Sequence, residues 1–176
     1  MKTSDFDYRL PQEAIAQTPA EPRHASRLMV LDRAGGTLQH VIFRDLVRFL
    51  RPDDLLVINR TRVIPARLIA RKPTGGRVEI LLLKRIGERT WEALIGGKGV
   101  RIGQRLSLAD APSATVTEEL EGSRRIVQFE EALESLLPGI GQMPLPPYIH
   151  TPLTDPERYQ TVYAQTSGSA AAPTAG

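Results

Sequence analysis

Cysteine is absent from the 176 residues, and histidine and aromatic residues are scarce. Without cysteine the chain can form no disulfide scaffold and no thiolate metal site, and it has no cysteine nucleophile. The remaining soft metal ligands, His24, His40 and His150, lack the sequence spacing that is typical of metal sites. We therefore expect no bound metal.

Long apolar runs and an export signal are also missing. The longest apolar runs, such as Ile80–Leu83, are only about four residues, whereas a helix that spans a bilayer needs about 20. Asp5 and Asp7 lie where the apolar core of a signal peptide would be required. We expect a cytoplasmic protein that has no membrane partner.

Charge is distributed unevenly although the net charge is only +3. Residues 60–105 contain 12 basic and 3 acidic side chains, whereas residues 106–137 contain 2 basic and 7 acidic ones. A segment this basic is a candidate surface for a polyanion such as RNA. Solvated outer faces of strands would give the same excess, and composition alone does not separate the two interpretations.

The first third of the chain shows mixed strand and helix patterns. Leu28–Asp32 and Gln39–Ile42 are predicted strands, joined by a turn at residues 33–36 that contains two glycines. Apolar residues between Phe43 and Leu50 recur at i, i+3, i+4 and i+7, which predicts an amphipathic helix. Leu55–Ile58 is a predicted buried strand.

The middle of the chain, from residue 64 to residue 129, has the alternation of short strands. Glycine-containing turns separate most of these runs, which favours a small antiparallel barrel or sandwich. Trp91 alternates with apolar residues and is a predicted core residue. The predicted strands are Ile64–Arg71, Arg77–Lys84, Thr90–Ile95, Ala114–Glu118 and Arg125–Phe129.

The last part returns to helix and loop patterns. Glu130–Leu137 is a predicted helix that Pro138-Gly139 ends, and Gly141–Ile149 is a proline-rich extended loop. Asp155 is a predicted cap of a helix that reaches about Gln165. The predicted fold is a mixed α/β domain interrupted by an inserted small antiparallel β-barrel. The expected boundaries are residues 1–62 and 141–176 for the α/β domain and residues 63–140 for the barrel.

The polar segment from Asn59 to Arg67 is the first candidate site, because it follows a predicted buried strand. Ligands of open α/β sheets bind beyond the carboxyl ends of strands. Asn59 and Thr61 can hydrogen-bond a sugar or a base, while Arg62 and Arg67 can form forked contacts with a carboxylate or phosphate. A polar linker that enters the barrel explains the same residues, and both interpretations stay open.

Three further features are weaker candidates. Tyr148, in a stiff proline-rich loop, can stack on a base or sugar, although it can equally pack within a connector. The small residues 171–176 permit close approach of a ligand, or form a flexible tail. His40 is a candidate proton carrier, with a structural histidine as the alternative, and His24 is a predicted surface residue. Gly96-Gly97-Lys98-Gly99 lacks the Walker pattern and is a predicted strand turn.

Taken together, motifs from residue 5 to residue 176 resemble one family, the S-adenosylmethionine:tRNA ribosyltransferase-isomerases of queuosine biosynthesis. The matching motifs are Asp5-Phe6-Asp7-Tyr8-Arg9-Leu10-Pro11, Ser26-Arg27-Leu28-Met29-Val30-Leu31-Asp32, His40 with Phe43, Asp45 and Leu46, Asn59 with Thr61-Arg62-Val63-Ile64-Pro65-Ala66-Arg67, Thr74-Gly75-Gly76, Pro144-Leu145-Pro146-Pro147-Tyr148-Ile149, Arg158-Tyr159-Gln160-Thr161-Val162-Tyr163 and Ala171-Ala172-Pro173-Thr174-Ala175-Gly176.

The resemblance implies a transferase that moves and isomerises the ribosyl part of S-adenosylmethionine onto 7-aminomethyl-7-deazaguanine at the tRNA wobble position. The product would be epoxyqueuosine, with adenine and methionine released. S-adenosylmethionine would be a co-substrate, so no cofactor is expected, and the tRNA would carry a GUN-type anticodon. The full-length protein would be a monomer.

The resemblance also suggests roles for particular residues. His40 is a hypothetical catalytic base. The expected substrate-binding residues are Asn59, Thr61, Arg62, Arg67, Tyr148, Pro173, Thr174 and Gly176, and the expected tRNA-binding residues are Arg71, Lys72, Arg77, Lys84 and Arg85.

Three departures from the family pattern are visible. Asp53 replaces a usual glycine, Ala170 replaces a usual valine, and the chain has about half the family length. The C-terminal half of the α/β domain is therefore expected to be absent, and the chain alone to be poorly stable and inactive. The competing hypothesis is a non-catalytic RNA-binding module. A methyltransferase is disfavoured because no Gly-x-Gly cofactor loop follows a strand.

Overall fold

The chain forms two units in the computed structural model, which describes residues 1–174 and residue 176. The first unit contains Met1–Val57 and Pro146–Pro152. The second contains Ile58–Leu145 and Leu153–Gly176. Among the described residues, no helix is long and apolar enough to cross a membrane.

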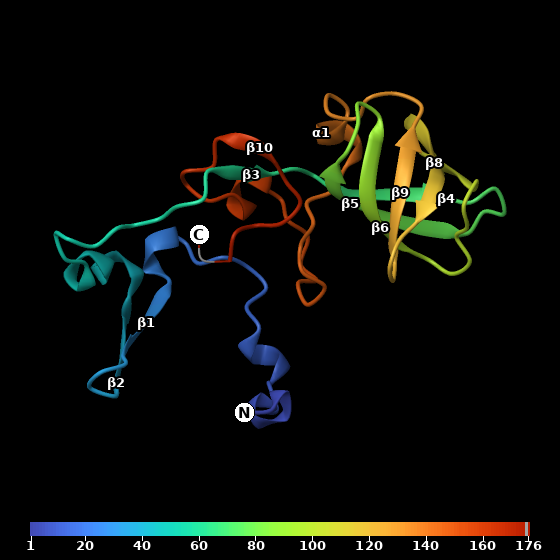
Figure 1. Cartoon of the computed structure of the whole chain (residues 1–176). Coiled ribbons are helices and arrows are strands. Elements are labelled where there is room, and N and C mark those ends of the chain that lie inside the picture. The colour runs from blue at the N-terminus through green and yellow to red at the C-terminus, as the bar shows by residue number, and fades with distance from the viewer. Residues whose placement is uncertain (175) are drawn as a thin grey trace. The chain divides into compact units, whose positions relative to one another are not determined.

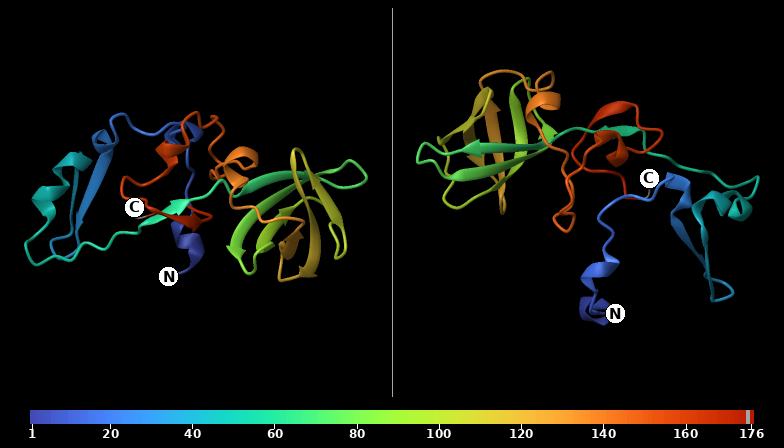
Figure 2. Two further views of the ribbon diagram at one scale, coloured as in Figure 1. Left: turned by 90° about the horizontal axis from the view of Figure 1, so that it is seen from above. Right: turned by 180° about the vertical axis from the view of Figure 1, so that it is seen from behind.

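Six antiparallel strands of the second unit close into a barrel, in the order β4-β5-β6-β9-β8-β7. Figure 1 shows the barrel with β4, β5, β6, β8 and β9 labelled, and Figure 2 shows it from above and from behind. The expected small antiparallel barrel is confirmed, although the sequence pattern missed one strand, β7. The strands are β4 (Arg67–Arg71), β5 (Arg77–Arg85), β6 (Thr90–Gly96), β7 (Arg105–Leu108), β8 (Ala111–Glu119) and β9 (Arg124–Phe129).

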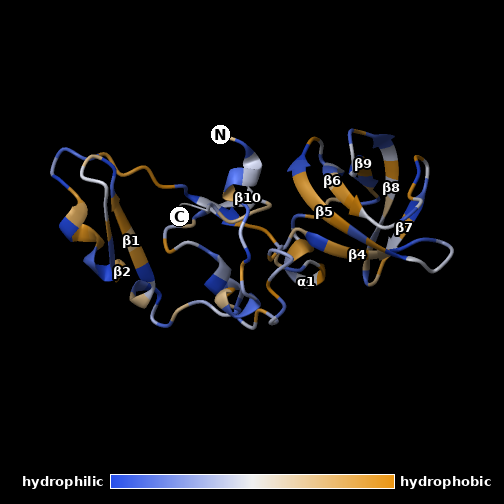
Figure 3. Ribbon diagram, turned by 90° about the horizontal axis from the view of Figure 1, so that it is seen from below, coloured by the Kyte–Doolittle hydropathy of each residue, from blue (hydrophilic) through white to orange (hydrophobic). Residues whose placement is uncertain are grey.

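The barrel interior is filled by every second residue of its strands. Val78, Ile80 and Leu82 of β5 are fully buried, and the residues between them face outward. Trp91 on β6 belongs to the same core, as predicted. Figure 3 shows orange, apolar stretches along the strands of the barrel. Because successive side chains of a strand point to opposite faces, this alternation produces one apolar interior and one polar exterior.

The barrel is inserted between two strands that pair with each other. β3 (Thr61–Val63) precedes the barrel, β10 (Thr166–Ser169) follows it, and the two run parallel. The register of β10 shifts between Ser167 and Ser169 at Gly168, whose φ of 139° favours glycine. The chain therefore leaves a neighbouring pair of strands, builds the barrel and returns, as expected for a domain interrupted by an inserted barrel.

The first unit contains the predicted hairpin. β1 (Arg27–Asp32) pairs antiparallel with β2 (Thr37–Ile42). The turn is stabilised because the Asp32 carboxylate accepts a hydrogen bond from the Ala34 amide at 3.0 Å, and Gly36 has a φ of 65°. The other elements are short 3₁₀ helices: η1 (Thr3–Phe6), η2 (Gln12–Ala14), η3 (Arg23–Ala25) and η4 (Phe43–Phe49).

Two predictions in the first unit are wrong. The expected amphipathic α-helix is the 3₁₀ helix η4, which has no buried residue. The expected buried strand Leu55–Ile58 does not form, and its side chains are 46–88% exposed. No other described segment pairs with this run, and an isolated strand leaves its backbone groups unpartnered. Figure 3 shows the run as an orange trace between η4 and β3.

Two helix predictions after the barrel are also wrong. Glu130–Leu137 is not the helix; instead α1 (Leu137–Ile140) includes Pro138 near its start, where a missing amide hydrogen costs nothing. The helix expected to reach Gln165 is only the 3₁₀ turn η5 (Pro156–Tyr159). Its predicted cap is confirmed, because the Asp155 carboxylate accepts a hydrogen bond from the Glu157 amide at 2.9 Å.

Candidate functional site

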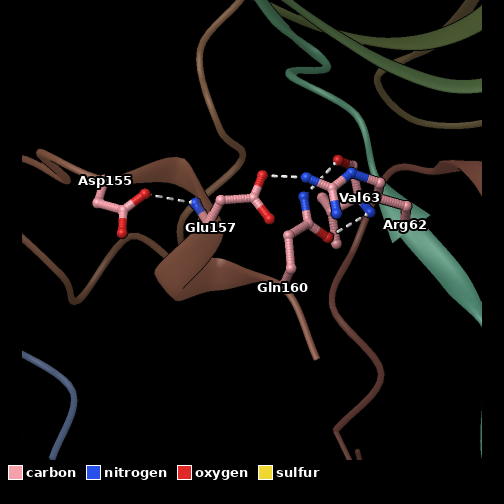
Figure 4. Close-up of polar contacts among 5 residues, drawn as sticks. All are labelled: Arg62, Val63, Asp155, Glu157 and Gln160. Carbon is pink, nitrogen blue, oxygen red and sulfur yellow. Dashed lines mark hydrogen bonds and ion pairs between the residues drawn. The ribbon is translucent and has the colours of Figure 1, made fainter. Parts of the chain in front are cut away.

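The strand β3 is held in place by the side chain of Gln160, which lies directly after η5 (Figure 4). The amide Oε1 of Gln160 accepts a hydrogen bond from the Val63 backbone N–H, and its Nε2 donates one to the Val63 carbonyl, both at 2.8 Å. Gln160 is only 6% exposed. A buried amide requires such partners, so this clamp fixes the backbone next to Arg62.

Arg62 forms an ion pair with Glu157 of η5. Figure 4 shows the guanidinium and the carboxylate pointing toward each other, with Asp155 capping the same turn from behind Glu157. The side chain of Arg62 is 33% exposed and that of Glu157 61%. Solvent can therefore reach the pair, in which a guanidinium engages a carboxylate. An incoming carboxylate or phosphate would compete with Glu157.

Asn59 and Thr61 interact with each other just before and at the start of β3. Asn59 Oδ1 accepts hydrogen bonds from the Thr61 amide at 2.7 Å and from the Thr61 hydroxyl at 2.5 Å. This is the local turn that asparagine side chains form with the backbone two residues later. The Arg60 carbonyl accepts from Gln165 and Thr166, which starts the ladder with β10. Both predicted binding residues therefore also shape the strand.

Arg67 connects the barrel to the proline-rich loop. Its guanidinium donates to the Leu145 carbonyl at 3.0 Å and lies 3.2 Å from Glu79 Oε1. Its backbone exchanges hydrogen bonds with Gln142. These contacts half-bury the side chain of Arg67, which therefore tethers the barrel to the loop. The guanidinium of Arg62, by contrast, contacts the exposed carboxylate of Glu157.

The small-residue motif follows β10 within the same unit. The Gly176 carbonyl accepts a hydrogen bond from the Tyr163 hydroxyl at 3.1 Å, and the Gly176 amide donates to the Pro173 carbonyl at 3.0 Å. A Cβ at Gly176 would lie 2.9 Å from the Tyr163 hydroxyl, so the site favours glycine. Thr174 is exposed, and Ala175 lies outside the described residues.

His40 and Tyr148 belong to the first unit, whereas the other predicted substrate-binding residues belong to the second. His40 is exposed on β2 opposite Met29. Tyr148 is 55% exposed on a loop that the side chain of Gln17 holds. Gln17 donates to the Tyr148 carbonyl at 3.0 Å and accepts from the His150 amide at 2.8 Å. The loop is thus fixed while the ring stays accessible.

The five predicted tRNA-binding residues lie at opposite ends of β5. Arg71 and Lys72 precede β5, and Arg77 begins it, whereas Lys84 and Arg85 end it. A strand rises about 3.3 Å per residue, so the two groups are separated by roughly 23 Å.

Within the described part of the chain, no cluster of three or more histidine or acidic side chains could hold a metal ion.

Comparisons with known proteins identify the family. The family model described as "Queuosine biosynthesis protein" matches residues 3–176. The chain belongs to this family. It is 56% identical to the S-adenosylmethionine:tRNA ribosyltransferase-isomerase of Symbiobacterium thermophilum and 52% identical to that of Clostridioides difficile. Each alignment covers 100% of this chain and 53% of the relative, so the chain spans about half the length of these curated relatives.

The chain is also similar in sequence to a solved structure. The crystal structure of S-adenosylmethionine tRNA ribosyltransferase from Thermotoga maritima is 47% identical to this chain. The match covers 72% of this chain and 44% of that chain, with a TM-score of 0.35.

The sequence patterns did not indicate the residues whose side chains hold the candidate site in position. Gln160 and Glu157 support β3, and Gln17 supports the Tyr148 loop. Gln160 lies inside the Arg158–Tyr163 motif that carries the family resemblance, and Gln17 follows the opening motif Asp5–Pro11. The residues beside them in the sequence do not indicate a partner for either. Their partners are 97 to 133 residues away in the sequence, so no local signal could have identified them.

Proposed function

We propose that the protein containing this chain transfers and isomerises the ribosyl moiety of S-adenosylmethionine onto 7-aminomethyl-7-deazaguanine at the tRNA wobble position. The products are epoxyqueuosine in tRNA, adenine and methionine. The observation that carries the proposal is the match of residues 3–176 to the queuosine biosynthesis family, together with the name shared by relatives that are 52–56% identical over the whole chain.

Arg62 is the proposed partner of the methionine carboxylate of S-adenosylmethionine. Its guanidinium already engages the carboxylate of Glu157 in a solvent-accessible position, and arginine binds carboxylates through paired donors. Substrate would take the place of Glu157 in this exchange. The Gln160 clamp on Val63 keeps the backbone next to Arg62 fixed, which limits the loss of freedom on binding.

The remaining roles follow from what the reaction requires. A base must remove a proton next to the sulfonium, and His40 is the proposed base. The aminomethyl nitrogen must be held near the ribose carbon that it attacks. Asn59, Thr61 and the exposed ring of Tyr148 are proposed contacts to sugar or base. Pro173, Thr174 and Gly176 would let substrate approach the backbone closely.

Transfer RNA is proposed to bind the barrel at one or both ends of β5, where Arg71, Lys72, Arg77, Lys84 and Arg85 lie. RNA binding depends on contacts between cationic side chains and phosphates. The enzyme would use S-adenosylmethionine as a co-substrate, without a further cofactor, act as a monomer in the cytoplasm, and select tRNA with a GUN-type anticodon.

Release of adenine tests the proposal directly. The chain would be mixed with S-adenosylmethionine and tRNA that carries the aminomethyl-deazaguanine base, beside a longer polypeptide continued past Gly176. Adenine release and a ribosyl mass gain on the wobble nucleoside, from either polypeptide, support the proposal. If only the longer one reacts, residues beyond Gly176 complete the active site. If neither reacts while both are folded, the proposed reaction is wrong.

A non-catalytic RNA-binding module is the second candidate, favoured by the excess of basic residues between 60 and 105. Such a module would bind tRNA with a steep salt dependence and would not bind S-adenosylmethionine. Isothermal titration of the chain with S-adenosylmethionine separates the two candidates, because only the transferase has a site for this small molecule.

A further inference from the structure

Four cationic residues gather at one end of the barrel. Arg71 and Arg77 are register partners at the end of the β4–β5 hairpin, the green loop at the right edge of the barrel in Figure 1. Lys72 occupies the hairpin turn, and Lys98 the exposed turn that follows β6. We refer to Arg71, Lys72, Arg77 and Lys98 as the hairpin cluster.

The turn between β4 and β5 is shaped so that Lys72 reaches the neighbouring turn. Lys72 Nζ donates to the Lys98 carbonyl at 2.8 Å, and a Cβ on Gly76 would lie 2.8 Å from Lys72 Cε. Glycine at position 76 therefore leaves the path of the lysine side chain open. Arg71 donates to the Gly75 carbonyl at 3.2 Å. Both side chains are thus held by carbonyls, which leave their positive charge uncompensated.

No acidic side chain in the described part of the chain forms an ion pair with the hairpin cluster. By contrast, several barrel arginines are neutralised by Glu79, Glu92, Glu119, Glu130 and Glu134. Glu79 shares the outer face of β5 with Arg77, but its ion pair is with Arg67. Like charges directly opposite each other on paired strands are destabilising, so the Arg71–Arg77 pair opposes folding unless an anion lies beside it.

We propose that the hairpin cluster is the surface that contacts the phosphate backbone of RNA, and that the opposite end of β5 is not. This inference rests on the proposed tRNA substrate and narrows the contact to one end of the barrel. It adds Lys98, which lies in the Gly96-Gly97-Lys98-Gly99 turn and was not among the predicted tRNA-binding residues. Lys84 and Arg85 lie at the other end, where Glu134 neutralises Arg85 at 2.6 Å.

The geometry favours a polyanion over a single small anion. Arg71, Arg77 and Lys98 are exposed and Lys72 is partly buried, and none of the four is a fully buried side chain. The cationic groups are spread over two adjacent turns. A phosphate backbone presents charges in a row and binds such arrays by releasing counterions, whereas one phosphate gains little from dispersed exposed lysines and arginines.

Salt-dependent tRNA binding to the 176-residue chain tests this inference. The variants are Arg71→Gln with Lys72→Gln and Arg77→Gln, a separate Lys98→Gln, and Lys84→Gln with Arg85→Gln. Arg89→Gln is the matched control, since Arg89 is exposed in the β5–β6 turn at the other end. Circular dichroism verifies folding, and fluorescence anisotropy gives Kd at several salt concentrations.

The triple variant should weaken tRNA binding at least tenfold and reduce the slope of log K against log salt by about 2, because each lost phosphate contact removes about 0.7–0.9. Lys98→Gln should reduce the slope by less than 1. The double variant and the control should change Kd less than twofold. Equal losses at both ends, or no loss in the triple variant, would overturn the inference.

Adenine release by the longer polypeptide, measured in parallel, separates this inference from the proposed function. If reaction occurs but the triple variant binds tRNA normally, the hairpin cluster is not the contact and the function stands. If the triple variant loses tRNA binding but the longer polypeptide without substitutions releases no adenine, the contact stands and the proposed reaction fails.

Discussion

Gln160 reaches across 97 residues of sequence to hydrogen-bond both the amide and the carbonyl of Val63, and the whole barrel lies between them in the chain. The clamp therefore closes the base of the insertion by side-chain contacts, next to the β3–β10 ladder that closes it by backbone contacts. It also lies one residue from Arg62, so the same contact supports both the fold and the proposed carboxylate site.

Replacing Gln160 by leucine should destabilise the second unit. The variant leaves two buried backbone groups of Val63 without partners, and each such loss costs about 1–3 kcal/mol. We expect a fall of about 2–4 kcal/mol in the free energy of unfolding, measured by urea denaturation. Gln165→Leu is the control, because Gln165 is exposed. Equal effects of the two variants would show that the clamp contributes nothing specific.

Removing the charge of Glu157 should have a small effect on stability and a larger one on binding. An exposed ion pair contributes about 0–1 kcal/mol, so Glu157→Gln should unfold at nearly the same urea concentration as the unmodified chain. S-adenosylmethionine should bind severalfold more tightly, because residue 157 no longer has a carboxylate that competes with the substrate carboxylate for Arg62. Calorimetric titration measures this. Arg62→Gln should lose binding, and a Glu157→Gln protein that loses it equally would contradict the competition.

Leu68 on β4 is a suitable probe of the barrel core, since it is fully buried. Leu68→Ala should lower the free energy of unfolding by about 3 kcal/mol, because a buried leucine leaves a cavity when truncated. Ile86→Ala is the control: Ile86 is half exposed and its truncation should cost less than about 1 kcal/mol. Similar losses for the two variants would mean that the barrel is loosely packed.

The exposed run Leu55–Ile58 should promote self-association. Extended apolar segments with free backbone groups pair with other chains. Leu55→Ser with Val57→Ser should reduce light scattering and dye binding to exposed apolar surface, with the thermal transition of the barrel unchanged. Ile86→Ser changes an isolated apolar residue and should not have this effect. Unchanged scattering in the double variant would locate the association elsewhere.

The barrel could be predicted because its strands alternate between apolar and polar residues over enough length. β7 was missed because it is short and only Leu106 is fully buried in it. The helix expected at Glu130–Leu137 does not form, because Leu133 and Leu137 pack against the barrel from a loop and a short turn. The spacing of apolar residues indicates which residues are buried, but it does not always indicate the backbone conformation that buries them.

The strand expected at Leu55–Ile58 is a different kind of error. The residues have strand propensity, but a strand requires a partner, and none of the described segments supplies one. The candidate site was predicted only in part for a related reason. Arg62 could be proposed from its chemistry alone, whereas Gln160 and Glu157 act through contacts that exist only after folding.

The side-by-side departure and return of the chain at β3 and β10 has a consequence for how such proteins can vary. Two parallel strands lie about 4.8 Å apart, so the chain enters and leaves the barrel at neighbouring points. A change of length in an exposed hairpin turn of the barrel is expected to leave the β3–β10 pair in place, because exposed turns tolerate insertions. A longer hairpin between β4 and β5 is expected to be tolerated in this way, while Arg62 on β3 keeps its place.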